Sequence, residues 1–220
     1  MRFKYIVIVL SIAGTVILYG LSSLSQPSII SLSDIPLNEG KQVMLIGVVT
    51  MYQTTTYGAL LITIRDENTT NSSTVLLYVE GAVTVEYGDI ISATGVVQQY
   101  NNNWELSVSN PRFVTVLQHW EDRSFPVWQL ATNPSKYVDT NVNVTGIIEA
   151  VSKNGFTLQD TQGTFIVPVS WSQSTQLNVQ SGALVAVHGR FLYKAETLSY
   201  SLQITDLDSG IFVLNEGWHA

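Results

Sequence analysis

The stretch GDIISATGV at residues 88–96 and the stretch GALVAVHGR at residues 182–190 are two copies of one pattern. Each copy begins with a glycine, continues through a mostly apolar run and reaches a second glycine near its end. Gly88 and Gly182 are 94 positions apart, and Gly95 and Gly189 share the same offset. The sequence therefore predicts that the chain contains one structural unit twice.

The repeat extends toward the N-terminus through shorter patterns. Gly47 and Gly146 each interrupt a long apolar run, and Asp66 and Asp160 each close a run of alternating apolar and polar residues. The offset is 94 at the aspartates but 99 at these glycines, so the first copy holds five extra residues between its first two strands. Alternation with a period of two is typical of β-strands, and we predict five short strands in each copy.

A closed barrel is the expected arrangement of these strands. A flat sheet of five short strands would leave two unpaired edges, whereas a barrel pairs every strand and fills its interior with side chains. Glycines inside strands allow the sharp bends that a small barrel requires. The predicted fold class is all-β, with two tandem five-stranded barrels after one N-terminal transmembrane helix.

The order of strands, glycines and aspartates resembles the oligonucleotide/oligosaccharide-binding (OB) barrel, in the form met in tRNA-anticodon-binding proteins and replication protein A. The likeness covers residues 28–117 and 126–214, which leaves residues 1–27 as an anchor or signal peptide and 215–220 as a tail. It implies that a ligand lies across the second and third strands, between the loops that join strands one and two and strands four and five.

We expect a ligand to bind the first barrel, because its outer face carries more aromatic residues than that of the second. Alternation turns some side chains of its second and third strands outward, and several aromatic residues fall near the flanking loops. The candidate ligand-binding residues are Tyr52, Tyr57, Leu61, Arg65, Leu76, Tyr78, Tyr100 and Trp104. An alternative is that Leu61, Leu76 and Tyr78 pack on the other barrel or on a partner.

The N-terminal segment, residues 5–24, is long and uncharged. A helix of this length spans the hydrocarbon core of a bilayer, so a single-pass membrane anchor is predicted. Arg2 and Lys4 precede it and the next charged residue is Asp34, which predicts a cytoplasmic N-terminus and extracytoplasmic barrels. The alternative is a signal peptide cleaved near Ser25.

The composition excludes several classes of function. The chain has no cysteine, which removes disulfides, thiolate metal sites and a cysteine nucleophile. Neither a Ser/His/Asp set nor a phosphate-binding glycine loop stands out, so we expect no enzyme activity and no cofactor. Apart from Arg2 and Lys4, eight basic residues accompany 17 acidic ones, a balance that disfavours a polyanionic ligand.

The function predicted from these observations is a membrane-anchored, extracytoplasmic binding or scaffolding module without catalytic activity. Protein or carbohydrate ligands suit a neutral surface with exposed aromatic rings. One alternative is a single-stranded nucleic-acid-binding protein, and another is a structural subunit of a cell-surface assembly. Haem chaperones with an anchor and a similar barrel carry a His-x-x-x-Tyr motif after the barrel, which neither His188 nor His219 matches, so haem binding is not expected.

Overall fold

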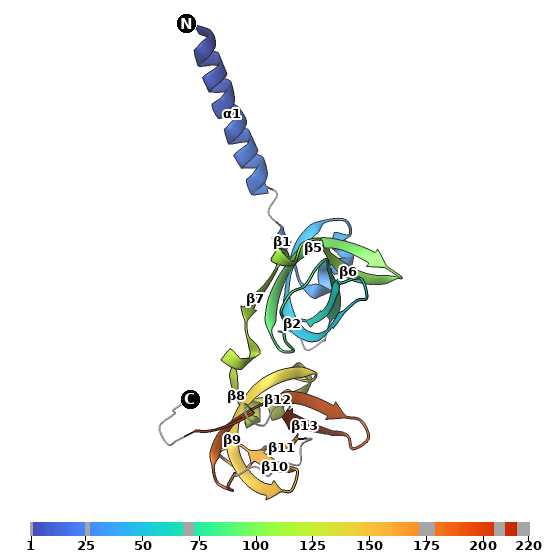
Figure 1. Cartoon of the computed structure of the whole chain (residues 1–220), viewed down its shortest axis with the longest axis vertical. Helices are drawn as coiled ribbons and strands as arrows, with labels where there is room; N and C mark the ends of the chain where they lie inside the picture. The colour runs from blue at the N-terminus through green and yellow to red at the C-terminus, as the bar shows by residue number, and fades with distance from the viewer. Residues whose placement is uncertain (1, 25–26, 68–72, 172–178, 205–209, 215–220) are drawn as a thin grey trace.

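The computed structural model describes residues 2–24, 27–67, 73–171, 179–204 and 210–214. Helix α1 (Arg2–Leu24) extends away from two β-barrels that follow it along the chain (Figure 1). Within the described ranges, no helix combines the length and the apolar character needed to cross a membrane. The anchor predicted over residues 5–24 is therefore not confirmed.

The first sheet has seven strands, of which five close into a barrel. Its order is β1-β2-β3-β4-β6-β5-β7, and an additional pairing of β2 with β5 closes the ring. Within the ring only β4 and β6 run parallel. The strands are β1 (Ser28–Ile29), β2 (Gln42–Thr54), β3 (Leu60–Arg65), β4 (Thr74–Val79), β5 (Ile90–Tyr100), β6 (Asn103–Val108) and β7 (Val114–Gln118). Two 3-10 turns, η1 (Leu32–Asn38) and η2 (Pro111–Phe113), lie between them.

The second sheet repeats the first strand for strand. Its order is β8-β9-β10-β11-β13-β12-β14, closed by pairing of β9 with β12. The strands are β8 (Ser124–Pro126), β9 (Thr140–Ser152), β10 (Gly155–Gln159), β11 (Ile166–Trp171), β12 (Leu184–Lys194), β13 (Ser199–Ile204) and β14 (Ile211–Val213). The short helical elements are η3 (Trp120–Asp122), α2 (Val127–Thr132) and η4 (Pro134–Lys136).

Each barrel is built around its own apolar core. The alternation predicted for β3 and β4 is confirmed, since Leu60, Ile62 and Ile64 point inward and are buried. Large fully buried side chains fill the two interiors, Leu45, Ile62, Ile64, Leu77, Ile91 and Leu106 in the first and Leu130, Ile148, Leu158, Phe191 and Leu202 in the second.

The paired glycines of the repeat lie where strands approach closely. A Cβ on Gly189 would stand 2.7 Å from the carbonyl oxygen of Gln203, and one on Gly95 would overlap the carbonyl oxygen of Ser107. No side chain fits at either point, so the second glycine of the repeated pattern is required by the barrel itself.

The all-β prediction with two closed five-stranded barrels is confirmed, and the strand order is that expected for the OB barrel. Each unit has more strands than predicted, because each barrel also carries two peripheral strands. β1 runs parallel to β2 as β8 does to β9, and β7 is antiparallel to β5 as β14 is to β12. Figure 1 shows β7 leading from the first barrel toward the second.

Candidate functional site

The outer surface of β3, β4 and β6 is the candidate binding surface, and we call it the barrel-1 face. Cross-strand pairing places Leu61 beside Tyr78 and Leu76 beside Glu105. Leu61, Leu76 and Tyr78 are half-buried, so each offers part of its side chain to solvent. The members of the barrel-1 face are Leu61, Thr63, Leu76, Tyr78, Glu105 and Ser107.

Neighbouring strands extend the barrel-1 face on both sides. Met51 of β2 pairs with Thr63, and Val96 of β5 pairs with Ser107. The side chains of Met51 and Val96 are both exposed. Apolar side chains are therefore exposed or half-buried on β2, β3, β4 and β5, whereas β6 contributes Glu105 and Ser107. Gln53 of β2 and Gln98 of β5 are exposed among them.

The barrel-1 face carries the carboxylate of Glu105, and the carboxylate of Glu80 lies directly after β4. Glu105 is only 5% exposed although it belongs to an outward row, and its Oε1 accepts a hydrogen bond of 2.7 Å from Nε2 of Gln98. Glu80 follows β4 directly, two residues beyond Tyr78, and is exposed. In a strand, residues two apart share one side, so Glu80 belongs to the same side as Leu76 and Tyr78.

Two exposed tyrosines stand at the flanking loops, as predicted. Tyr57, between β2 and β3, is 96% exposed, and Tyr100 at the end of β5 is 63% exposed. The β2–β3 loop precedes Leu60, which pairs with the last residue of β4. The β5–β6 loop precedes the start of β6, and β6 runs parallel to β4. The two tyrosines therefore flank opposite ends of the barrel-1 face.

Two of the candidate aromatic residues lie elsewhere. Tyr52 and Trp104 are half-buried and pack against the core of the first barrel, so the structure does not place them on the barrel-1 face. Trp104 shares the alternation of Leu106 and Val108, which are both fully buried. Reading that alternation back along β6 would have placed Trp104 inside from the sequence.

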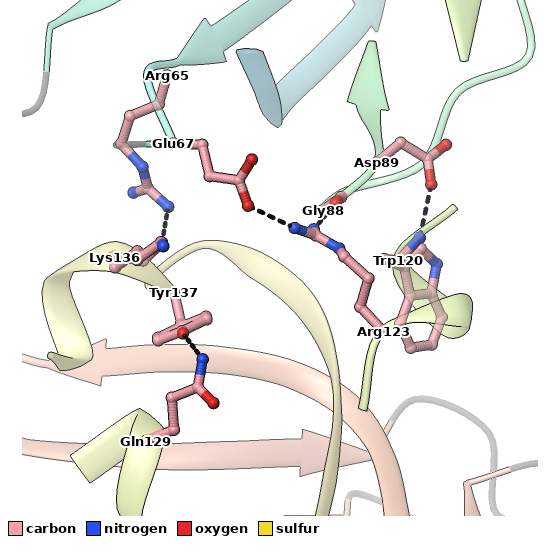
Figure 2. Close-up of polar contacts among 9 residues, drawn as sticks. All are labelled: Arg65, Glu67, Gly88, Asp89, Trp120, Arg123, Gln129, Lys136 and Tyr137. Atoms are coloured by element: carbon pink, nitrogen blue, oxygen red, sulfur yellow. Dashed lines mark hydrogen bonds and ion pairs between the residues drawn. The ribbon is translucent and has the colours of Figure 1, made fainter. Parts of the chain in front are cut away.

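Arg65 is also unavailable on the open surface, because the second barrel covers it. Its guanidinium donates one hydrogen bond of 2.6 Å to the carbonyl oxygen of Lys136 (Figure 2). It donates another, of 3.1 Å, to the carbonyl oxygen of Val138. Burial lowers the pKa of Arg65, and the nearby carboxylate of Asp139 partly offsets this effect. Arg65 therefore joins the barrels instead of presenting a cation to a ligand.

Arg65 belongs to a larger set of contacts that we call the inter-barrel seam. Its members are Arg65, Glu67, Glu86, Tyr87, Gly88 and Asp89 on the first barrel and Trp120, Arg123, Lys136, Val138, Asn141 and Arg190 on the linker and the second barrel. The two barrels are therefore in direct contact on either side of the short connection at residues 118–126. Figure 2 shows the polar part of the seam.

Arg123 bridges two segments of the first barrel. Its Nη1 lies 3.0 Å from Oε1 of Glu67 in an ion pair, and its Nη2 donates a 2.7 Å hydrogen bond to the carbonyl oxygen of Gly88. Gly88 is buried at φ +94°, and a Cβ there would stand 2.5 Å from the carbonyl oxygen of Asn141. The first glycine of the repeated pattern is therefore a point of close approach between the barrels.

Asp89 is the most deeply buried charged group of the seam, with no exposed surface. Its Oδ1 accepts a hydrogen bond from the backbone amide of Trp120, and its Oδ2 accepts one from the amide of Glu86. The indole Nε1 of Trp120 in turn donates to Oε2 of Glu86 at 2.7 Å. Two hydrogen bonds from Trp120 thus fix the linker where it leaves the first barrel, and a third, within that barrel, holds Asp89 beside Glu86.

Aromatic contacts complete the seam. The guanidinium of Arg190 lies 3.6 Å from the ring centroid of Tyr87, and the Tyr87 ring is 4.7 Å from that of Tyr52. The amide of Asn141 donates to the carbonyl oxygen of Tyr87. The seam was not predicted residue by residue, although one signal was available: Asp89 occupies the position that the repeat fills with Ala183.

The seam changes the distribution of positive charge. Arg65, Arg123 and Arg190 are three of the eight basic residues that follow Lys4, and all three are held between the barrels. Among the residues that the structure describes, no group of three His, Asp or Glu side chains is arranged to hold a metal ion.

No family model matches the sequence, and no curated protein is significantly similar to it. Solved structures that resemble the fold include a Leishmania major protein described as an aspartyl-tRNA synthetase (16% identity, TM-score 0.34). They also include a murine DNA-binding protein bound with double-stranded DNA (12%, 0.33) and the single-stranded DNA-binding protein of Thermus aquaticus (13%, 0.28). These matches cover 43%, 80% and 81% of this chain, and 21%, 99% and 95% of the respective neighbours.

The chain thus spans about a fifth of the synthetase, and all three TM-scores are low. The assignment of an OB-type barrel rests on the strand order and pairing described above.

Proposed function

We propose that this protein is a non-catalytic binding module that holds a ligand of low negative charge, a protein or a carbohydrate, on the barrel-1 face. The observation that carries the proposal is the combination of half-buried Leu61, Leu76 and Tyr78 with exposed tyrosines at both ends of the face. Aromatic and aliphatic side chains in this arrangement supply contact area to a ligand that carries little charge.

A single-stranded nucleic acid is the second candidate, because two of the solved structures with a similar fold carry DNA-binding names. Such binding requires stacking rings and a positive groove that follows the phosphates. Tyr78, Tyr57 and Tyr100 could supply the rings. The barrel-1 face lacks the cations that phosphates require, since Arg65 is bonded within the inter-barrel seam and the face carries the carboxylate of Glu105.

We also propose that residues 5–24 attach the protein to a membrane, with the barrels on the extracytoplasmic side. The support is the uncharged sequence, the basic residues that precede it and the exposure of described apolar side chains of α1, among them Leu10 and Leu18. Extraction of native membranes at alkaline pH tests the attachment, because a peripheral protein is released into the supernatant whereas an inserted one stays in the pellet.

The ligand class can be tested on the full-length chain in nanodiscs. Three proteins are compared: the native chain, Tyr78→Ala and the matched variant Ile166→Ala on the second barrel. Each is titrated with a labelled deoxythymidine oligonucleotide at low salt, and each is applied to a glycan array and to a peptide array. The proposal predicts no oligonucleotide binding, and a glycan or peptide signal that Tyr78→Ala removes and Ile166→Ala leaves unchanged. Tight binding of the oligonucleotide would establish the second candidate instead.

The remaining alternative, a structural subunit of a surface assembly, predicts a different oligomeric state from that of a binding module. Size-exclusion chromatography of the detergent-solubilised protein should give a single small species for a binding module, whereas a filament subunit would elute as large polymers.

A further inference from the structure

The barrel-1 face places a carboxylate inside apolar surface. Glu105 is 5% exposed, adjoins Leu76 through the parallel pairing of β4 and β6, and has a neutral amide, that of Gln98, as its hydrogen-bond donor. A charge that has lost most of its hydration is stabilised strongly by a cation that reaches it. The barrel-1 face therefore contains a site at which electrostatics favour a positively charged group of the ligand.

The surroundings of Glu105 define what else the ligand must offer. Leu61 and Leu76 present aliphatic surface, and the ring of Tyr78 can receive a cation over its face as well as apolar contact. Glu80 adds a second, exposed carboxylate at the end of the row that Leu76 and Tyr78 begin. Side chains in this row recur every two residues, which matches the spacing of alternate side chains in an extended peptide.

The charges of the face agree with this chemistry. Arg65, which belongs to the same side of β3, is withdrawn into the seam by its bonds to the carbonyl oxygens of Lys136 and Val138. The six members of the barrel-1 face thus include the carboxylate of Glu105 and no amino or guanidinium group, and Glu80 adds a second carboxylate directly after β4. Such a surface attracts a basic ligand and repels phosphates.

We propose that the ligand of the barrel-1 face is an extended polypeptide segment in which lysine or arginine alternates with apolar residues, its cation pairing with Glu105. This inference rests on the proposed function and narrows it to one class of partner. A basic side chain beside Glu105 and apolar side chains against Leu61, Leu76 and Tyr78 use every group that the face offers.

The experiment compares three fluorescein-labelled peptides of one length, which carry Lys, Gln or Glu at alternate positions between leucines and tyrosines. Their affinities for the full-length protein in nanodiscs are measured by fluorescence anisotropy at two salt concentrations. The Lys peptide should bind at least about tenfold more tightly than the Gln peptide, as expected for one charge-assisted hydrogen bond. The Glu peptide should bind weakest, and the Lys preference should fall as salt rises.

Substitutions on the barrel-1 face test which side chains produce the preference for the Lys peptide. Glu105→Gln and Glu80→Gln should each reduce the preference for the Lys peptide, and Leu61→Ala should weaken all three peptides together. Glu149→Gln, which removes an exposed carboxylate from the second barrel, is the matched control and should change nothing. Glu80 is exposed, so Glu80→Gln keeps the test valid if Glu105→Gln reduces the melting temperature.

The outcomes separate this inference from the proposed function. Equal affinities for the Lys and Gln peptides, or a Lys preference untouched by both glutamate variants, would overturn the inference. If Leu61→Ala still weakened binding in that case, or if a glycan bound there in place of any peptide, the proposed function would stand. Absence of every peptide and glycan from the barrel-1 face would overturn both.

Discussion

The backbone amide of Trp120 donates a 3.1 Å hydrogen bond to Oδ1 of Asp89, a carboxylate without exposed surface. The other oxygen of Asp89 holds the amide of Glu86 within the first barrel. One buried side chain therefore joins the loop before β5 to the linker after β7. Because the carboxylate is buried, its removal would leave the Trp120 amide without this acceptor.

Replacing this carboxylate should destabilise the linker. Asp89→Ala leaves the buried amide of Trp120 and the part-buried amide of Glu86 without an acceptor, and we expect the free energy of unfolding to fall by about 2–3 kcal/mol. Urea denaturation followed by tryptophan fluorescence measures the change. Asp122→Ala, an exposed aspartate in the same linker, is the control. Equal effects of the two variants would mean that burial of Asp89 does not stabilise the linker.

The glycines that begin the two copies of the repeated pattern allow a second prediction, on the close approach of the barrels. Gly88 and Gly182 both have positive φ, +94° and +87°, but a Cβ on Gly182 would meet no atom within 4 Å. Gly182→Ala should therefore cost only the backbone strain, about 1–2 kcal/mol. Gly88→Ala adds a collision with the carbonyl oxygen of Asn141 and should cost clearly more. Thermal unfolding of the two variants compares them, and equal melting temperatures would contradict the close approach at the seam.

The guanidinium of Arg65 should be needed to hold the barrels in a fixed arrangement. Arg65→Met keeps the aliphatic stem but removes both donors to the carbonyl oxygens of Lys136 and Val138, a loss of about 1.5–3 kcal/mol. Small-angle scattering should then detect a broader range of distances between the barrels. Arg112→Met, at an exposed position in η2, should leave the scattering curve unchanged.

The stability of the seam should depend on pH through His188. Its ring lies 5.3 Å from that of Trp120 and 4.9 Å from that of Phe212, and burial lowers the pKa of His188, with Glu121 acting in the opposite sense. A base with a lowered pKa is held neutral in the folded state. The stabilisation that neutral His188 contributes is present above the pKa of histidine in the unfolded chain, near 6.5. It is lost as the pH falls toward the lower pKa of His188 in the folded protein.

Denaturation at pH 7.5 and pH 5 measures this dependence. The native chain should be less stable at pH 5 by a larger margin than His188→Gln, which cannot take up the proton. An NMR titration of the imidazole that gave a pKa of 6.5 or higher would contradict the effect of burial.

The sequence predicted the barrels well because their determinants are local. Alternation in β3 and β4 placed Ile62 and Leu77 inside, and the glycines at 95 and 189 marked the close crossings of strands. The outward positions of Leu61, Leu76 and Tyr78 followed from the same alternation. Three of the peripheral strands, β1 with two residues and β8 and β14 with three each, are too short for any periodic signal.

The errors at the candidate site have physical causes that local patterns do not contain. Arg65 has the outward position that alternation assigns to it, but its acceptors lie more than 70 residues away in the chain. Trp104 was assigned to the loop before it, whereas the strand already begins at Asn103 and turns its ring inward. Both errors arise where tertiary packing decides between two positions that the pattern allows.

Asp89 and Ala183 occupy matching positions of the two copies, and only the first of them can accept a hydrogen bond from an incoming linker. The contact between the two units is therefore asymmetric, although both share one fold: the carboxylate that holds the linker belongs to the first copy alone.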